Sequence, residues 1–538
     1  MTATEGRKIL QSEKLPRYTI WFLAIIFIAT NFSHHNWVRV KPEHRGVINN
    51  DIAVYYSYLT AAFIEKDLSL EFIEEPGFRN EYRFWDVKTE NGNRIIITSM
   101  GLAFLYLPFF LLAHLLAHVF GLSTDGYGSI YQFFLVFGSL VYVLLAFQIL
   151  KNLLRKYFSA RVTALTLLLV GIGTNLYYYT TYEAPMSHSY NFFLMILFTW
   201  RIIRWYEQSD WRNALIIGLL LGLISLIRPT NILVFFVLLL WGVNGKQSFI
   251  ERVVFYLKKW YLVAIMIAGF IIAWSPQMIY WKMVAGKFLY FSYGAAGASF
   301  YFLHPHIMGS LFSYLKGWYI YTPVMLVATL GILPLRKRIP GLFLPVFILW
   351  ITMVYVQSSW WSWWFGGGYG LRAYIDIYGL MAFPLAVMVE KILNMEKRVL
   401  RYSLQGMLAL LLMLSIMQTY QYKKTIMYYC GMTKETYWTN FFRFTKNDGY
   451  LEAFHEPDHN LARLGIYYFY DISEDHSELL TADAETEKMK ILEVLNADRK
   501  LMKEISRYAE RENISIEEGL QIVAGTIYQN MYSKAESR

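Results

Sequence analysis

The chain has 538 residues, of which 56% are hydrophobic, 18% aromatic and only 17% charged, and its mean hydropathy is +0.31. Because soluble globular domains carry about 25% charged residues, this composition excludes an ordinary soluble enzyme and a disordered chain, and it indicates an integral membrane protein. The net charge of +10 does not predict nucleic-acid binding, since Lys and Arg gather in short clusters between apolar runs. The single cysteine, Cys430, excludes an intramolecular disulfide and a cysteine metal site.

Eleven apolar runs are long enough, or nearly long enough, to cross a hydrocarbon core of about 30 Å. They lie at 18–33, 129–150, 162–180, 189–203, 213–227, 230–243, 260–281, 317–335, 341–357, 372–392 and 402–420. Lys and Arg cluster at 7–17, 151–161, 201–212, 246–259, 336–338 and 391–401, whereas the loops 121–128 and 181–188 carry none. The positive-inside rule therefore predicts an all-α, multi-pass membrane protein with a cytoplasmic N-terminus.

One further apolar run, 102–120, contains Pro108, His114 and His118. We expect it to lie at the outer interface rather than to cross. In the alternative topology it crosses and the N-terminus lies outside, which breaks the positive-inside rule only for the first basic cluster. The two short runs 213–227 and 230–243 meet at Arg228-Pro229-Thr230, and this predicts a break between two helices.

Two regions outside the spans are large. The first outer loop, 34–128, is expected to hold two interfacial helices, 52–64 and 99–120, the first of them because its apolar residues recur at helical intervals. The tail, 421–538, carries more Asp and Glu than Lys and Arg, and we expect a small, mainly helical extracytoplasmic region. Within it, Ser515 is the predicted N-cap of a helix. Residues 1–420 then form the membrane domain.

Asp51 precedes the first interfacial helix and is expected at its N-cap. Its two interpretations are a helix cap and a general base held at the outer surface beside the aromatic side chain of Tyr55. Transfer of a group to a hydroxyl or amine requires such a base, together with a cation that stabilises the leaving group.

The candidate cations lie in or beside apolar runs. Arg228 is flanked by apolar residues, and an arginine within a membrane is paired or functional. Arg372 follows an aromatic, Gly-rich outer loop and is either a phosphate ligand or a side chain reaching the interface. Glu183 and His188 share an outer loop and are further candidate site residues, with helix capping or packing as their alternative roles. Lys316 is another candidate, and its alternative role is that of an interface anchor.

Several stretches, in this order, resemble the GT-C superfamily of membrane glycosyltransferases, and most closely its bacterial group related to protein O-mannosyltransferases and aminoarabinose transferases. They cover about 40–390 and include Asn50-Asp51, Thr98-Ser99-Met100-Gly101, Pro185-Met186-Ser187-His188, Ile227-Arg228-Pro229-Thr230-Asn231, His304-Pro305-His306, Lys316-Gly317 and the stretch from Trp363 to Arg372.

The resemblance implies a GT-C-like bundle of about eleven membrane helices in a bacterial cytoplasmic (inner) membrane, with the active site on the outer face. It implies transfer of a sugar, with inversion, from a polyprenyl-phosphate-linked donor to a lipid, glycan or protein acceptor, with Asp51 as base. The chemistry of Arg228 and Arg372 makes these two residues the candidates for binding the donor phosphate. Related sequences often place a Lys or Tyr just before the Gly of the second interfacial helix, whereas this chain has Ile97 and Thr98 there. A cation for the donor phosphate is then expected from another residue, and Arg94 is the candidate.

Other interpretations stay open at this stage. A polytopic transporter or flippase is expected to show paired broken helices in two repeats, whereas this chain has one broken pair. A polysaccharide polymerase or ligase for lipid-linked glycans is the other alternative. The sequence assigns no cofactor, although Asp51, Glu183, His188, His304 and His306 could supply ligands for a divalent metal ion.

Overall fold

The computed structural model describes residues 3–35, 37–38, 46–74, 86–446, 454–471, 479 and 483–536. Contacts divide the chain into two compact units. The first unit comprises Met1–Ala296, Tyr321–Val354 and Arg372–Thr419, and the second comprises Gly297–Ile320, Tyr355–Leu371 and Tyr420–Arg538. The second unit therefore contains the tail beyond 420 together with two segments that the sequence assigned to the membrane domain.

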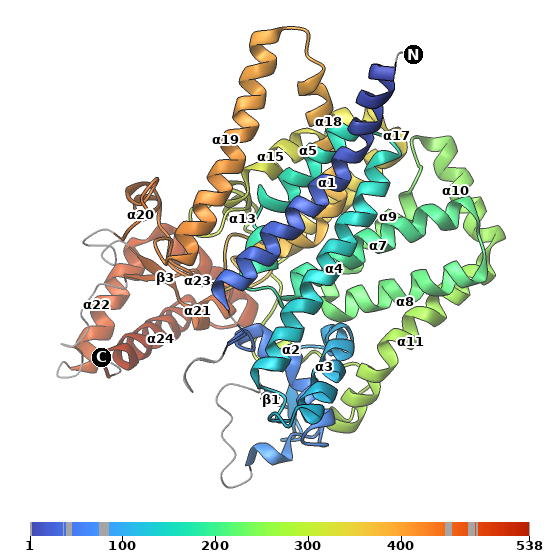
Figure 1. The fold of residues 1–538 in the computed structure, drawn as a ribbon. Helices are drawn as coiled ribbons and strands as arrows, with labels where there is room; N and C mark the ends of the chain where they lie inside the picture. Colours follow the sequence, from blue (N-terminus) through green and yellow to red (C-terminus); the bar gives the residue numbers. More distant parts are fainter. Residues whose placement is uncertain are drawn as a thin grey trace. The chain divides into compact units, whose positions relative to one another are not determined.

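The described residues are mostly helical, as expected for an all-α membrane protein (Figure 1). The helices in the first half of the chain are α1 Ala3–His34, α2 Asn50–Phe63, α3 Gly101–Val119, α4 Ser129–Arg155, α5 Ala160–Ile172, α6 Leu176–Thr181, α7 Ser187–Glu207, α8 Trp211–Ile227, α9 Phe235–Leu240, α10 Lys246–Lys258, α11 Trp260–Ala285 and α12 Ser292–Ala295. Those in the second half are α13 Ile307–Phe312, α14 Trp318–Tyr321, α15 Pro323–Leu330, α16 Ile332–Arg338, α17 Pro340–Ser358, α18 Tyr378–Leu393, α19 Arg398–Lys423, α20 Lys434–Thr439, α21 His459–Arg463, α22 Ala484–Ala497, α23 Arg499–Glu512 and α24 Ile516–Glu536.

Short 3-10 helices and two small two-stranded antiparallel sheets complete the secondary structure of the described residues. The 3-10 helices are η1 Glu71–Glu74, η2 Pro229–Val234 and η3 Arg372–Ile377, and the strands are β1 Asp86–Lys88, β2 Arg94–Ile96, β3 His455–Pro457 and β4 Phe469–Asp471. Strand β1 pairs with β2 in antiparallel register, Val87 opposite Ile95. Strand β3 pairs with β4 in the same way, Glu456 opposite Tyr470.

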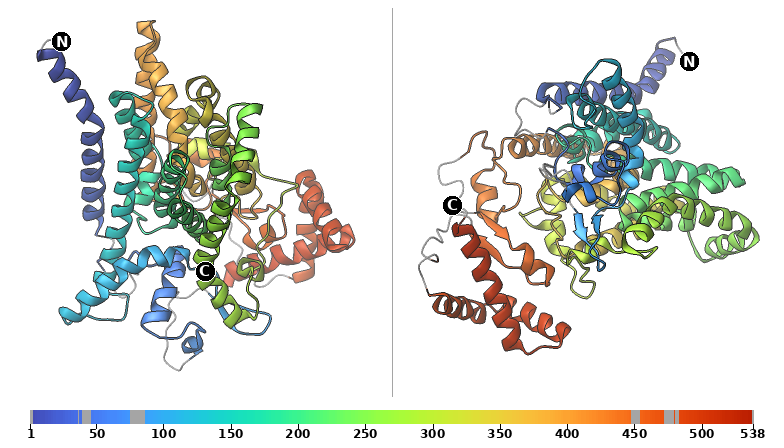
Figure 2. Two further views of the ribbon diagram at one scale, coloured as in Figure 1. Left: turned by 90° about the vertical axis from the view of Figure 1, so that its right-hand side faces the viewer. Right: turned by 90° about the horizontal axis from the view of Figure 1, so that it is seen from below.

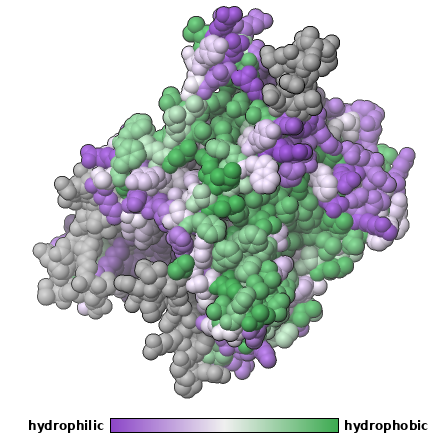
Figure 3. All heavy atoms as spheres, viewed as in Figure 1, coloured by the Kyte–Doolittle hydropathy of each residue, from purple (hydrophilic) through white to green (hydrophobic). Residues whose placement is uncertain are grey.

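In the described part of the chain, six helices are long and apolar enough to cross a membrane, which fits a multi-pass membrane protein but not the expected count of eleven spans. They are Lys14–His34, Gly101–Val119, Ser129–Arg155, Trp260–Ala285, Pro340–Ser358 and Arg398–Lys423. Apolar side chains of these helices are exposed on the surface; Trp21 and Ile25 of α1, for example, are 65% and 64% exposed. Figure 3 shows hydrophobic residues over much of the middle of the view.

Part of the difference in count has a local cause, because three of the expected spans are interrupted. The run 162–180 is divided into α5 and α6 at Gly173, and the run 317–335 is divided between α15 and α16 at Gly331. The run 230–243 lies first in the 3-10 helix η2 and then in α9, which ends at Leu240. Hydropathy alone does not detect such breaks, since the residues on both sides are equally apolar.

Helices of the first unit pack pairwise, α1 on α5, α4 on α7 and α8 on α11. The closest pair is α8 and α11, which lie side by side in Figures 1 and 2. A Cβ atom on Gly218 would lie 2.0 Å from the carbonyl oxygen of Met266, and one on Gly269 would lie 2.7 Å from that of Leu215. Glycine is therefore required where the backbones of these two helices approach each other, as is common in membrane helix pairs.

Both helices expected in the first outer loop are confirmed as helices, with α2 at Asn50–Phe63 and α3 at Gly101–Val119. They pack against each other, and Figure 1 places them together at one end of α4. Length and hydropathy count α3 among the helices able to cross a membrane. Its location at the interface therefore stays a prediction.

The second unit has its own hydrophobic core between α22, α23, α24 and the α21 region. Its fully buried members are Leu461, Ile466, Leu495, Ile505, Val523, Ala524 and Ile527. The predicted helix start in the tail is confirmed, because α24 begins at Ile516 and the Ser515 hydroxyl accepts a hydrogen bond from the backbone N–H of Glu518 (3.0 Å). The expectation of a mainly helical tail holds for its described residues.

Candidate active site

Asp51 lies in the first turn of α2 and forms an ion pair with Arg372. The Asp51 Oδ2 and Arg372 Nη2 atoms are 2.7 Å apart, and the two side chains are 37% and 14% exposed. The prediction that Asp51 caps the helix is wrong, because α2 begins at Asn50 and its N-cap residue is Asn49. The carboxylate is thus partly open to solvent and faces a guanidinium.

Arg228 lies at the predicted break between two helices, and this break is confirmed. Helix α8 ends at Ile227, Arg228 has an extended backbone (φ −144°, ψ 109°), and η2 begins at Pro229. A proline disfavours the helical conformation in the residue before it. Local sequence therefore stops α8 at this point and leaves the Arg228 side chain at a helix end.

A buried carboxylate that the sequence reasoning missed, Asp376 of η3, holds Arg228 in place. Asp376 is fully buried, and its Oδ2 atom lies 3.4 Å from Arg228 Nη1. The His188 Nδ1 atom lies 3.1 Å from Asp376 Oδ1 and 3.2 Å from Arg228 Nη1. Arg228 is therefore part of a buried polar network, and its role at a donor phosphate stays a prediction.

Two amides complete the shell around Asp376. Asn231 and Asn191 each donate a side-chain N–H to Asp376 Oδ2, at 2.8 and 3.2 Å. Four side chains, from α7, η2 and Arg228 between α8 and η2, thus converge on the one carboxyl group of Asp376 in η3. Sequence offered a signal for it, since Asp376 is an acidic residue inside the apolar run 372–392 and such residues are costly unless they have a role.

Tyr55 connects the Asp51–Arg372 pair with the Asp376 network. Its side chain is buried. Burial raises the pKa of Tyr55, Asp51 raises it further, and Arg228 and Arg372 lower it. Asp51, Arg372 and Arg228 therefore all lie close enough to Tyr55 to shift its pKa.

Glu183 borders the same site, whereas Lys316 and Arg94 are engaged elsewhere. Glu183 interacts electrostatically with Arg372 and accepts a hydrogen bond from the Tyr178 hydroxyl (3.2 Å). Lys316 is buried in the second unit, where its ammonium donates to the backbone carbonyls of Gly368 and Tyr429. Arg94 pairs with Asp86 (2.7 Å) and Glu74 (2.9 Å) beside the first hairpin.

The stretch Thr98–Gly101 fixes the segment that carries Arg228. The Ser99 hydroxyl donates to the carbonyl oxygen of Leu226. A Cβ atom on Gly101 would lie 2.6 Å from both the backbone nitrogen of Ile227 and the carbonyl carbon of Leu226. Only glycine fits here without moving that backbone, so the start of α3 sets the position of the end of α8.

The arrangement suits proton transfer next to a phosphate. A partly exposed carboxylate can accept a proton, and the neighbouring guanidinium is a donor whose geometry matches phosphate oxygens. Among the described residues, no group of three or more His, Cys, Asp or Glu side chains could hold a metal ion.

No family model and no curated protein matches the chain. The interpretation of the site therefore depends on its own geometry and chemistry.

Proposed function

We propose that the protein is a membrane glycosyltransferase that moves a sugar from a polyprenyl-phosphate-linked donor to an acceptor, with inversion, on the outer face of a bacterial cytoplasmic membrane. The observation that carries the proposal is the partly exposed Asp51 carboxylate, 2.7 Å from Arg372 and linked through Tyr55 to Arg228. The six helices of the described chain that are able to cross a membrane are consistent with a lipid-linked substrate.

In the proposed reaction, the acceptor oxygen attacks the anomeric carbon while Asp51 takes the acceptor proton. The bond between that carbon and the phosphate oxygen breaks, and its electron pair leaves with the polyprenyl phosphate. Arg372, released from Asp51 when the donor phosphate enters, balances this charge together with Arg228. Asp376 and His188 act as positioning residues, because they hold the Arg228 guanidinium.

The test is Asp51→Asn, which keeps an oxygen that accepts from Arg372 but removes the basic group. We expect turnover to fall by about 10²–10⁴-fold, the usual contribution of a general base, with unchanged folding and unchanged binding of undecaprenyl phosphate. Turnover is measured as release of undecaprenyl phosphate from undecaprenyl-phosphate-linked hexoses and pentoses. Glu65→Gln, which is exposed and lies two residues beyond the C-terminal end of α2, is the matched control and should leave both properties unchanged.

Near-normal turnover in Asp51→Asn contradicts the assignment of the base and makes Glu183 the next candidate. The alternatives give different outcomes. A transporter or flippase for a polar lipid moves the donor across the membrane without cleaving the sugar–phosphate bond, so transport without cleavage by the wild-type protein would overturn the proposal. A polymerase or ligase also cleaves the bond, and it is recognised by a product in which glycan chains are joined.

A further inference from the structure

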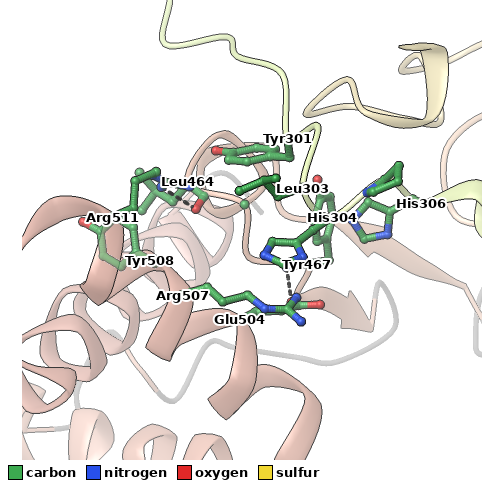
Figure 4. A pocket seen from close by; sticks show the side chains of 12 residues that line it. Tyr301, Leu303, His304, His306, Leu464, Tyr467, Glu504, Arg507, Tyr508 and Arg511 are labelled. Atoms are coloured by element: carbon green, nitrogen blue, oxygen red, sulfur yellow. Dashed lines mark hydrogen bonds between the residues drawn. The ribbon is translucent and has the colours of Figure 1, made fainter. Parts of the chain in front are cut away.

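The second unit contains a pocket of about 380 Å³ that the proposed catalytic chemistry does not use (Figure 4). One wall is the segment 301–306, with Tyr301, His304 and His306. The opposite wall is α23, where Glu504, Arg507 and Arg511 recur at helical spacing and so face the same side. Its volume lies within the range of small-molecule sites.

Cationic groups dominate the pocket. Arg507 is half-buried, and it makes no ion pair or side-chain hydrogen bond with any other described residue. Arg511, in contrast, donates to the Leu464 carbonyl oxygen (2.9 Å) and pairs with Glu512, so it belongs to the wall. Among the described lining residues Glu504 is the one acid, and it is committed to the backbone N–H of Tyr467 (2.9 Å).

Uncharged hydrogen-bonding groups lie beside Arg507. The Tyr467 side chain is buried, and its hydroxyl has no hydrogen-bond partner among the described residues. The imidazole of His306 contacts the edge of Tyr467, with ring centres 4.1 Å apart. Burial, with the charges of Lys500, Arg507 and His304, lowers the pKa of His306 to about 4. At neutral pH the ring is therefore uncharged and offers one donor and one acceptor.

We propose that this pocket binds a small polar ligand carrying a carboxylate or phosphate group, with the oxyanion on Arg507 and hydroxyl groups on Tyr467 and His306. Arg507 interacts electrostatically with Glu504 but forms no ion pair with it, and a half-buried guanidinium without a direct carboxylate contact is costly unless an anion completes it. Buried hydroxyls are likewise almost always hydrogen-bonded. This proposal goes beyond the glycosyltransferase function and does not depend on it.

The test is isothermal titration of the full-length protein in detergent with glucuronate, inorganic phosphate and neutral glucose. We expect glucuronate or phosphate to bind and glucose to bind far more weakly. Arg507→Gln should weaken binding by roughly tenfold or more, since it removes a charge-assisted hydrogen bond, and Tyr467→Phe should weaken it less. Lys490→Gln, which removes the same charge from the exposed surface of α22, is the matched control.

Arg507→Lys guards against a folding artefact, because it keeps the charge and should retain more binding than the glutamine variant. Vesicles with and without phosphatidylglycerol form a second arm. If these vesicles compete with glucuronate in an Arg507-dependent manner, the oxyanion belongs to a lipid headgroup; if they do not, it belongs to a soluble molecule. Equal affinity for glucose and glucuronate, equal affinity of the wild type and Arg507→Gln, or no binding of either anion overturns the proposal.

Discussion

Replacing Asp376 by Asn tests the buried network most directly. The substitution keeps the size of the side chain but removes the charge opposite Arg228 (3.4 Å). It also places an N–H group where Asn231 and Asn191 now donate to an oxygen. Arg228 is only 13% exposed, so breaking this buried pair should cost about 3–5 kcal/mol. The measurement is the free energy of unfolding in mixed detergent–SDS micelles.

A double variant distinguishes pairing from simple burial. If Asp376 and Arg228 act as a pair, Asp376→Asn combined with Arg228→Gln should be less destabilising than the sum of the single variants, by about 0.5–3 kcal/mol. Removing both partners leaves no buried charge without compensation. The reasoning is refuted if the free energy of unfolding of Asp376→Asn lies within about 0.5 kcal/mol of that of the wild type, which is the usual range for surface substitutions. It is also refuted if the effects of the two single variants are additive.

Three further predictions concern other parts of the chain. Gly101→Ala should destabilise the protein by about 1–3 kcal/mol and weaken binding of undecaprenyl phosphate, because the added Cβ displaces the backbone before Arg228. Gly128→Ala should do neither, since the nearest atom to its Cβ would be a carbonyl oxygen 3.9 Å away. Reporter fusions after 125 and 430 should be extracytoplasmic and one after 245 cytoplasmic; the same side for 125 and 245 would contradict the proposed topology. The pKa of His306 falls from 6.5 to about 4 on folding, so the unfolded chain binds more protons than the folded chain between these two pH values. The free energy of unfolding should therefore decrease as the pH drops from 6.5 towards 4, by up to roughly 3 kcal/mol. In the wild type, protection of α23 from limited proteolysis should therefore decrease over the same pH range. In His306→Gln, most of this pH dependence should disappear.

The amino-acid sequence by itself determined the class of the protein and several local features. Apolar runs and basic clusters indicated a multi-pass membrane protein, because the hydrocarbon core requires long apolar helices. Pro229 ended the helix before Arg228, and Ser515 capped α24. These signals act between neighbours in the chain, within about one helical turn, and so they are readable without knowledge of the fold.

Tertiary structure alone decided which charges meet. Asp376 lies 148 residues from Arg228 and 188 from His188, and nothing in a periodic pattern pairs residues so far apart. The same holds for Arg372, whose partner proved to be Asp51, and for Lys316, which the fold places in the second unit. Ion pairs and buried networks depend on how helices pack across the whole chain. Only in the folded molecule does the attraction between paired charges offset the cost of removing them from water.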